Sequence, residues 1–357
     1  MFHLRDRELS LAVVRELQRQ GQRLRIMHVC GTHQDTVVRF GLDALLREAG
    51  VSIVQGPGCP VCVTTPGEIE MAVALAREGV TVATYGDMVR VPGISGSLAS
   101  VQTRGGDVRV VYDVHEAVAL ARGGRETVFV AAGFETTAPA TAAALLRDPP
   151  ETFSVLSCHR LIPPALEAIL SLGEVALDGI IDPGHVSVII GVEPYRSLSR
   201  SFRIPQVIAG FEPLDVLMAV HMLARQIREG RCEVENEYSR AVDPEGNTRA
   251  QDILHQVFTP VDAPWRGFST IPRSKLALQP AFARYDAERR YPEVLDPVRE
   301  QEDVQPPGCR CGEVLRGLLP PRDCALFGNT CTPEHPVGPC MVSREGSCHI
   351  EYRYGHD

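Results

Sequence analysis

Apolar and polar positions change in a regular rhythm along the first two thirds of the chain. Residues 5–20 carry apolar side chains at helical spacing and predict an amphipathic helix. Short apolar runs, typical of buried strands, then alternate with amphipathic stretches, typical of helices. The predicted strands are 23–29, 51–55, 80–87, 107–113, 127–135, 153–157 and 206–213, and the predicted helices are 36–50, 67–79, 137–148, 163–173 and 213–230.

Strands that alternate with helices predict parallel sheets with crossover helices, and therefore an α/β fold. We predict two parallel-sheet α/β domains that face a cleft, over residues 23–123 and 124–229, divided at Gly123 and Gly124. From about residue 230 the pattern fades, while proline and charge increase. Residues 1–22 and 230–357 are therefore expected to form helical or irregular segments, with extended packing segments and a linker into a cysteine-rich C-terminal domain.

Composition excludes several classes of function. The 357 residues carry a net charge of −9 with no basic patch, so we do not expect nucleic acid as a partner. No apolar run is long enough to span a bilayer, and the N-terminus lacks a signal-peptide pattern, so we expect a soluble, cytoplasmic protein. Lys275 is the only lysine, and the P-loop motif G-x-x-x-x-G-K-[ST] is absent.

Unusual residues follow the predicted strands. In open α/β sheets, ligands bind beyond the carboxyl ends of the strands. The loops at these ends are Cys30–His33, 56–62 with Cys59 and Cys62, Tyr85–Asp87, Gly133–Thr137 and Asp182–His185. If the two domains face each other, we expect these loops to line one cleft.

Cys30 lies between a predicted strand and a helix. Backbone N–H groups, the helix dipole and His33 would all favour its thiolate, the form that binds metal or attacks an electrophile. The alternative is a buried cysteine at a strand end. Cys59 and Cys62 form a single C-x-x-C without a second pair nearby, which disfavours structural zinc. A redox dithiol and an open thiolate site for iron or copper both remain open.

Two further motifs offer polar side chains. The GFETT motif contains Glu135, Thr136 and Thr137 at the start of a predicted helix, where the threonines could serve only as helix caps. His185 follows a Pro-Gly turn, and a lone histidine is more often structural than functional.

The eleven cysteines are unevenly distributed. Cys158 and Cys232 stand alone, and we expect them to be buried small apolar side chains. Six others lie between residues 309 and 348 at spacings C-x-C-x12-C-x6-C-x8-C-x7-C. A reducing compartment disfavours disulfides, so we expect a bound metal to hold such a segment together. Six thiols exceed the four ligands of one [4Fe–4S] cluster, which suggests a cluster beside a redox pair. The alternative is zinc with two free thiols.

Together these motifs resemble the HypD family of hydrogenase maturation proteins, essentially from end to end. The resemblance rests on CGTHQ, residues 56–66, GFETTAPA, DPGHVSVIIG and the tail from Cys311 to Cys348. It implies a fold of two α/β domains and a cluster domain. It also implies assembly of the Fe(CN)2(CO) unit of [NiFe]-hydrogenases, together with a HypC-type chaperone and a HypE-type cyanide donor, without nucleic acid or a membrane.

The resemblance further implies roles for single residues. Cys30 would be the iron ligand, and Cys59 and Cys62 would face the same cleft as further ligands or as a redox dithiol. The other cleft residues would be His33, Glu135, Thr136, Thr137 and His185. In the tail, which resembles the centre of ferredoxin:thioredoxin reductase, Cys309, Cys324, Cys331 and Cys348 would ligate a [4Fe–4S] cluster beside a redox pair of Cys311 and Cys340.

The resulting interpretation is a scaffold and redox component for iron–cyanide–carbonyl assembly. Electrons would pass from the tail through Cys311 and Cys340 to Cys59 and Cys62. One alternative is an iron-binding transfer scaffold without redox turnover. The other is an iron–sulfur thiol–disulfide reductase without mononuclear iron, for which Cys30 has no obvious use.

Overall fold

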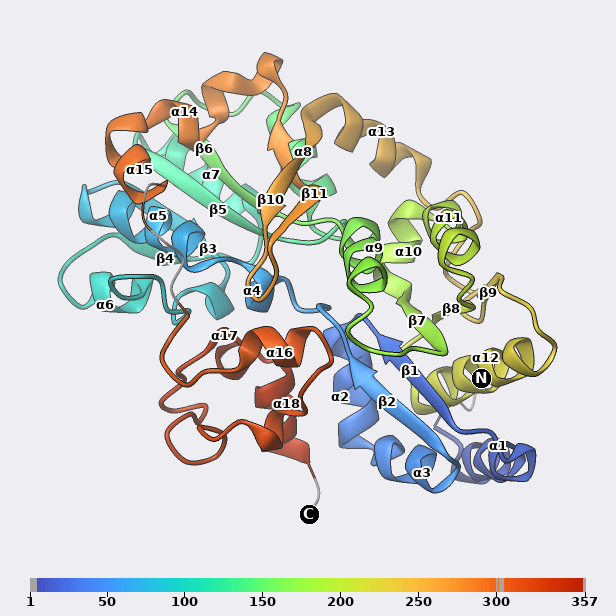
Figure 1. Cartoon of the computed structure of the whole chain (residues 1–357). Coiled ribbons are helices and arrows are strands. Elements are labelled where there is room, and N and C mark those ends of the chain that lie inside the picture. The colour runs from blue at the N-terminus through green and yellow to red at the C-terminus, as the bar shows by residue number, and fades with distance from the viewer. Residues whose placement is uncertain (1–4, 300, 302–304, 356–357) are drawn as a thin grey trace.

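Two parallel β-sheets with flanking helices form the body of the protein (Figure 1). The structure is a computed structural model and describes residues 5–299, 301 and 305–355. One sheet has the order β2-β1-β7-β8-β9 and the other β4-β3-β5-β6. The strands are β1 Leu24–His28, β2 Val51–Gln55, β3 Thr81–Thr84, β4 Val108–Val110, β5 Thr127–Gly133, β6 Phe153–His159, β7 Gly179–Pro183, β8 Gln206–Ala209 and β9 Val234–Asn236.

Helices connect these strands and cover the sheets. In chain order they are α1 Arg7–Gln20, α2 Gly31–Arg39, α3 Leu42–Glu48, α4 Pro60–Val63, α5 Pro66–Arg77, α6 Leu98–Gln102, α7 Val114–Arg122, α8 Ala138–Leu145, α9 Ile162–Leu172, α10 Gly184–Ile190, α11 Glu193–Phe202 and α12 Pro213–Arg228, with a 3-10 turn at Gly86–Met88. The predicted α/β class with parallel sheets is therefore confirmed, and the two sheets are consistent with two α/β domains.

The sheets do not follow the sequence boundary that we placed at residues 123 and 124. The five-stranded sheet pairs β1 and β2 with β7, and the four-stranded sheet pairs β3 with β5, so each sheet takes strands from both sides of the boundary. Strand–helix alternation predicts that strands are parallel, but it does not specify which strands become neighbours. The correct grouping places residues 24–55 and 179–236 in one sheet and 81–159 in the other.

Strands buried on both faces explain the nearly continuous apolar runs in the sequence. All residues of β5 and β6 are buried, and so are those of β3, β7 and β8. Helices from both faces therefore exclude water from the sheets. The strand ends, rather than their flanks, are left to form a site.

The predicted helix at 36–50 is two helices. The chain begins α2 directly after Cys30, and it breaks at Phe40 and Gly41 before α3. Gly41 has φ of 63°, a left-handed conformation that glycine adopts without steric cost. The earlier start places His33 inside the first turns of α2 rather than in a loop.

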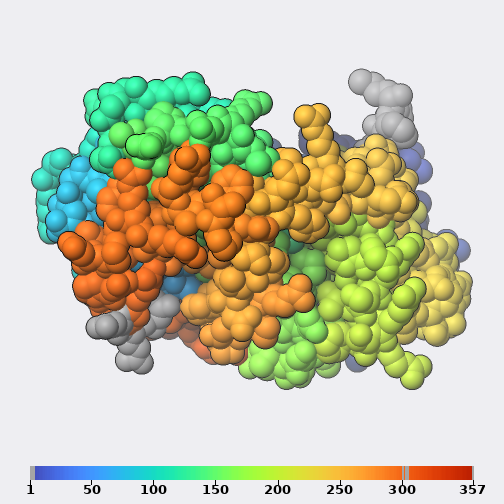
Figure 2. Space-filling model, turned by 90° about the horizontal axis from the view of Figure 1, so that it is seen from above, coloured from blue at the N-terminus to red at the C-terminus, as the bar shows by residue number. Residues whose placement is uncertain are grey.

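Residues 230–299 are more ordered than the expected packing segments and linker. They form α13 Thr248–Val257, an antiparallel pair of β10 Phe258–Pro264 and β11 Thr270–Leu278, a 3-10 helix Pro280–Tyr285, α14 Ala287–Arg290 and α15 Pro292–Arg299. Gold and orange atoms of this region run across the middle of one face of the molecule (Figure 2). The high content of proline and charge in this region does not predict regular elements. In addition, β11 alternates buried and exposed positions over only part of its length, so its hydrophobic pattern is a weak strand signal.

A buried charge network ties this hairpin to the sheets. The carboxylate of Glu68 on α5 lies 2.6 Å from the Arg160 guanidinium and 3.1 Å from the Lys275 ammonium. Burial opposes ionisation of Glu68, but the two cations outweigh it and lower its pKa to about 2. Glu68 therefore neutralises both buried cations, while Lys275 also lies 3.4 Å from the carboxylate of Glu288.

The C-terminal tail lies below the body, between the two sheets (Figure 1). Its short helices are α16 Cys311–Leu315, α17 Pro339–Val342 and α18 Ser347–Tyr354, with a 3-10 turn at Pro321–Asp323. Helices α16 and α17 pack against α4, and α18 packs against α2. The tail therefore contacts the loops after β1 and β2, which contain Cys30 and the C-x-x-C motif. Across the described residues, no helix is long and apolar enough to cross a membrane.

Candidate functional site at the strand ends

A cavity of about 710 Å³ lies where strand ends of both sheets meet the tail. Its lining includes Cys30 after β1, Thr136 and Thr137 after β5, and His185 after β7. The prediction that these loops share one cleft is confirmed for them. The cavity is large enough for a small ligand of several atoms beside a protein side chain.

Cys30 caps the N-terminus of α2 and is almost fully buried. Burial raises the pKa of its thiol to about 11, while backbone N–H groups of His33 and Thr32 counteract this in part. The expected N–H contacts therefore exist, but they do not make the free thiol acidic. Loss of hydration destabilises the thiolate more than these backbone dipoles stabilise it. A metal ion could still displace the proton and bind the sulfur.

His33 does not assist Cys30 as a cation. Its ring is buried, and its Nε2 lies 2.9 Å from the carbonyl oxygen of Gly210. Burial lowers its pKa to about 4, so the ring is neutral. A neutral Nε2–H donates to this carbonyl, and the ring stacks on Phe211. His33 therefore fixes α2 to the loop after β8 and does not line the cavity.

The loop at 56–62 passes directly behind Cys30. Gly58 is required there, because a Cβ atom at this position would lie 2.1 Å from the Cys30 backbone nitrogen. Cys59 and Cys62 are joined by a disulfide and are fully buried. Gly58, Pro60 and Val61 line the cavity, whereas the disulfide lies beneath them. Cys59 and Cys62 are therefore in an oxidised form that offers no thiolate to iron.

The GFETT motif is divided between two faces. Thr136 and Thr137 line the cavity beside Cys30, but the side chain of Glu135 turns away into a separate pocket. The Thr137 hydroxyl donates to the carbonyl of Phe134 at 3.2 Å, and neither threonine caps α8 through its side chain. Glu135 is thus not a residue of this cleft, because residues 135–137 form a turn between β5 and α8 that directs its side chain away from the two threonines.

His185 stands at the mouth of the cavity at the start of α10. Its ring stacks on Phe211 with centroids 3.9 Å apart, and partial burial lowers its pKa. The ring is thus held in place but still reaches solvent. It is available to donate or accept a hydrogen bond at the cavity mouth.

The tail supplies part of the cavity wall, which no pattern in the sequence predicts. Ser343, Arg344 and Glu345 line the cavity, and Asp87 accepts hydrogen bonds from the Ser343 hydroxyl at 3.0 Å and the Arg344 N–H at 3.1 Å. A Cβ atom on Gly31 would lie 2.7 Å from Glu345, so this loop sits directly on the start of α2. The position of the Tyr85–Asp87 motif after a predicted strand indicated that Asp87 lies near the cleft, but nothing in the sequence linked Asp87 to the tail.

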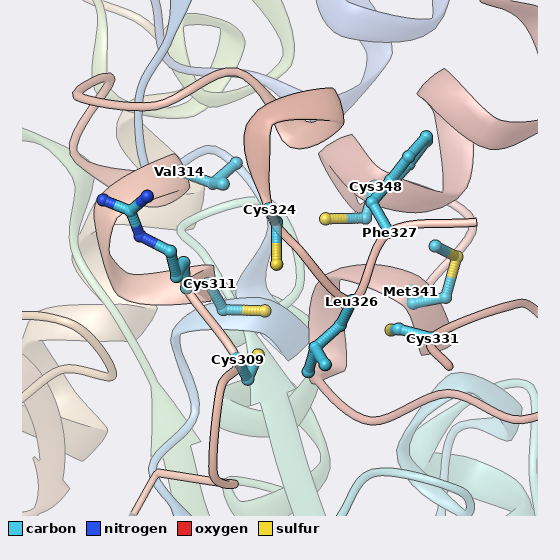
Figure 3. Close-up of a pocket in the computed structure, with 10 residues that line it drawn as sticks. Cys309, Cys311, Val314, Cys324, Leu326, Phe327, Cys331, Met341 and Cys348 are labelled. Atoms are coloured by element: carbon cyan, nitrogen blue, oxygen red, sulfur yellow. The ribbon is translucent and has the colours of Figure 1, made fainter. Parts of the chain in front are cut away.

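A second, smaller cavity lies within the tail. Five cysteines line it: Cys309, Cys311, Cys324, Cys331 and Cys348. The sulfur atoms of Cys311, Cys324 and Cys348 point toward the shared space (Figure 3). The remaining lining is largely apolar, with Val314, Leu326, Phe327 and Met341.

Cys311 connects the sulfur atoms of this region. It interacts with the thiols of Cys309, Cys340 and Cys348. These contacts raise the pKa of Cys340 and lower that of Cys348 to about 6. Cys340 is fully buried, outside the cavity lining, and adjacent to Cys311. The predicted redox pair is therefore in contact, and the four predicted cluster ligands lie around the cavity.

The donor chemistry of the tail suits an iron–sulfur cluster, because every donor that lines the cavity is sulfur. Within the described ranges, however, no group of three or more His, Cys, Asp or Glu side chains is arranged so that it could hold a metal ion. The thiols as placed are close to one another without forming a coordination shell. The residues fit such a group in kind and location.

The two solitary cysteines differ. Cys158 is fully buried on β6, as expected. Cys232 is only half-buried, and its thiol donates to the carbonyl of Arg203 at 3.1 Å, so its predicted burial was wrong. It lies in the short irregular segment between α12 and β9.

Comparison with known proteins places the chain among hydrogenase formation proteins. The family described as HypD, hydrogenase formation hypA family, matches residues 7–355. A hydrogenase expression/formation protein of Methanocaldococcus jannaschii is 45% identical, with 99% of each chain covered. Hydrogenase maturation factor HypD of Cupriavidus necator is 45% identical over 98% of this chain and 96% of the relative. Its Escherichia coli counterpart is 41% identical over 99% and 93%.

Proposed function

The chain belongs to the HypD family of hydrogenase maturation factors, and from that premise we propose that it is a scaffold and redox component for assembly of the Fe(CN)2(CO) unit. The observation that carries this proposal is the position of Cys30. It is a single free thiol at a cavity built from both sheets and the tail.

The iron unit is the cargo of this cavity, and the Cys30 thiolate is its ligand. Cyanide and carbonyl make iron low-spin and electron-rich, and a soft thiolate suits such a centre. Because burial raises the pKa of Cys30 to about 11, iron binding must release the thiol proton. Thr136, Thr137 and His185 provide hydrogen-bonding groups for the outer ligands of the iron.

Partners complete the site. One protein sulfur leaves coordination positions open, and a cysteine of a HypC-type chaperone would fill one of them, while a HypE-type donor would deliver cyanide. The rim of the cavity supports docking there, since Val110 is 54% exposed and Tyr112 is 89% exposed. Exposed apolar side chains beside a polar cavity are typical of an interaction surface.

Thiol–disulfide exchange would connect the tail to the cavity. A thiolate of the Cys311–Cys340 pair attacks the Cys59–Cys62 disulfide through a mixed disulfide, and the second thiol resolves it. The tail pair becomes a disulfide, and Cys59 and Cys62 take up two electrons and two protons. Packing of α16 and α17 on α4 supports this route, because exchange requires sulfur contact.

Cys309, Cys324, Cys331 and Cys348 would hold a [4Fe–4S] cluster, which supplies electrons one at a time when bound. The chain itself keeps the tail thiols in apolar surroundings and holds Cys340 against Cys311. The Cys311–Cys340 pair is thereby shielded from water, so that only an electron donor close to it would reduce it.

Replacement of Cys30 tests the proposal. Cys30→Ala, purified anaerobically with a HypC-type partner, should lose the infrared bands of iron-bound cyanide and carbonyl. The ultraviolet–visible absorption of the tail cluster should remain. Retained cyanide and carbonyl bands at wild-type intensity would remove Cys30 from the iron site.

A reductase without mononuclear iron is the second candidate, favoured by the Cys59–Cys62 disulfide beside the tail. Cys340→Ser discriminates, because it removes exchange while keeping the predicted cluster ligands. If the protein is a reductase alone, Cys340→Ser should abolish its maturation activity and Cys30→Ala should leave that activity unchanged. If it is a transfer scaffold alone, Cys30→Ala should abolish the activity and Cys340→Ser should leave it unchanged.

A further inference from the structure

The turn of the β10–β11 hairpin contacts both α4 of the body and α16 of the tail (Figure 1). This turn, residues 265–269, is called the hairpin tip below. Helix α4 contains Cys62, and α16 begins at Cys311, so the tip touches one element of each thiol pair. The proposed exchange between these pairs does not yet give the tip a role.

Trp265 fixes the hairpin tip to the body. Its side chain is fully buried, and its ring stacks on Phe134 with centroids 6.1 Å apart. The Nε1–H of the ring donates to the Ser274 hydroxyl at 2.9 Å. The Arg160 guanidinium adds a hydrogen bond of 3.2 Å to the carbonyl of Pro264, directly before the tip. The tip is therefore a fixed point of the body.

Arg266 joins the hairpin tip to the end of α4. Its backbone N–H donates to the Val63 carbonyl at 2.9 Å, and its Nε–H donates to the Thr64 carbonyl at 3.0 Å. Its Nη2 donates to the Pro92 carbonyl at 3.4 Å. Val63 and Thr64 directly follow Cys62, and Arg266 is 2% exposed, so water hardly competes for these bonds. One residue thereby holds the segment that carries the body disulfide.

Gly267 meets α16 backbone to backbone. A Cβ atom on Gly267 would lie 2.3 Å from the Gly312 Cα, and one on Gly312 would lie 2.8 Å from the Gly267 Cα. Gly312 directly follows Cys311, which in turn packs on the start of α17, because a Cβ atom on Gly338 would lie 2.6 Å from its Sγ. Helix α17 contains Cys340. The contact at Gly312 therefore positions both thiols of the tail pair.

We propose that the hairpin tip aligns the two thiol pairs for exchange, with Arg266 as a positioning residue that holds α4 while Gly267 holds α16. Exchange requires direct contact between the attacking sulfur and the disulfide. A misplacement of about 1 Å in such a reaction can cost about a hundredfold in rate. The inference rests on the proposed exchange and adds the element that aligns it.

The aligned step is balanced within the chain. A thiolate of the Cys311–Cys340 pair forms a bond with one sulfur of the Cys59–Cys62 disulfide, and the bond between Cys59 and Cys62 breaks. The second tail thiol then attacks the mixed disulfide and releases the body dithiol. Two electrons and two protons thus pass from the tail pair to the body pair, and the hairpin tip itself is chemically unchanged.

Timed reduction of the full-length, anaerobically purified protein tests the proposal. Dithionite supplies electrons to the tail, acid quenches the reaction, and alkylation with mass spectrometry counts the free thiols of Cys59 and Cys62. Arg266→Met removes the side-chain donors to Thr64 and Pro92, and the reduction should slow by about tenfold or more. Arg266→Lys keeps a donor but not the planar fork, and its rate should return to within about threefold of the wild type.

Gly312→Ala tests the second contact and does not depend on the folding of the Arg266 variants. Alanine favours a helix more than glycine does, so α16 is not weakened, but the added Cβ displaces it from the hairpin tip. Reduction should again slow by about tenfold or more. Glu313→Ala, in a surface pair with Arg310 on the same helix, is the matched control and should keep the wild-type rate. The tail-cluster absorption and the unfolding midpoint should stay unchanged in all four variants.

Cys340→Ser separates the inference from the exchange on which it rests. If the body pair stays oxidised in the wild type, or if Cys340→Ser is reduced at the wild-type rate, the exchange is wrong and the inference falls with it. If Cys340→Ser blocks reduction while Arg266→Met and Gly312→Ala keep the wild-type rate, the exchange stands and the hairpin tip does not align it. Slower reduction in both tip variants, at unchanged cluster absorption and with recovery in Arg266→Lys, upholds the inference.

Discussion

The body and the tail of this protein are held together by different forces. The body buries all residues of β3, β5, β6, β7 and β8, and its interior contains the ion pairs of Glu68 with Arg160 and Lys275. The tail has only short helices, and five cysteines line the small cavity inside it. Hydrocarbon burial stabilises the first region, whereas the proposed cluster would stabilise the second.

The proposed chemistry requires both a rigid site for iron and a redox-active centre, and the body and the tail each provide one of these properties. A rigid body can place Cys30, Thr136, Thr137 and His185 at one cavity without any cofactor. A tail whose fold depends on sulfur can respond to redox change. The loop at 343–345 belongs to the tail but lines the cavity of the body, so a change in one region can reach the other.

Removal of one tail thiol should have the largest effect. Cys324→Ser should abolish the iron–sulfur absorption of the tail, because three thiols are too few for a four-ligand cluster. The body should keep its far-ultraviolet circular dichroism and unfolding midpoint. Cys232→Ser is the matched control and should retain the absorption, since Cys232 lies far outside the tail cavity. If the body of Cys324→Ser unfolded together with the tail, this would contradict the claim that different interactions stabilise the two regions.

Removal of the buried carboxylate should damage the body instead. Glu68→Gln removes the counter-charge of the buried Arg160 and leaves Lys275 with Glu288, 3.4 Å away, and we expect a loss of about 3–5 kcal/mol in the free energy of unfolding. Urea denaturation measures this. Glu193→Gln changes an exposed pair with Arg196 and should cost less than about 1 kcal/mol. Equal losses in the two variants would show that the network does not stabilise the core.

The pH dependence of stability should reveal Glu135. Because burial raises its pKa from 4.5 to about 7, the folded state holds this proton more tightly than the unfolded state. Its contribution is full below pH 4.5 and is lost as the pH rises through about 7, with a loss of about 3 kcal/mol. The difference between wild type and Glu135→Gln, measured by urea denaturation from pH 4.5 to 8, should show this slope. A difference that is constant with pH would contradict it.

Loosening the contact between body and tail should have the smallest effect. Asp87→Asn weakens two hydrogen bonds to the loop at 343–345, at a cost of about 1–2 kcal/mol. Hydrogen exchange of residues 343–350 should therefore accelerate about tenfold. Asp43→Asn, in an exposed pair on α3, provides the control and should leave this exchange unchanged. No acceleration in Asp87→Asn would mean that the loop is held by other contacts.

Much of the fold could be predicted from hydrophobic patterning alone. The strands β1, β2, β5 and β6 were found within two residues, because buried parallel strands give continuous apolar runs. The pairing of β1 with β7, across more than a hundred residues, could not be predicted, because local sequence does not determine long-range neighbours. The hairpin of β10 and β11 was missed because only one side of it packs on the body.

The site was predictable as a set of loops but not as a set of side chains. Strand-end position correctly placed Cys30, Thr136, Thr137 and His185 at one cavity. It failed for Glu135 and His33, because adjacent residues in one motif can point to opposite sides. The contribution of Ser343–Glu345 depends on how the tail packs on the body, which spacing alone does not encode.

Infrared spectroscopy of the anaerobic protein with a HypC-type partner tests the central claim most directly. The wild-type complex should show bands of iron-bound cyanide and carbonyl, and Cys30→Ala should lose them while Cys158→Ala, at a buried position outside the cavity, keeps them. Equal bands in the wild type and in Cys30→Ala would contradict the assignment of the strand-end cavity as the iron site.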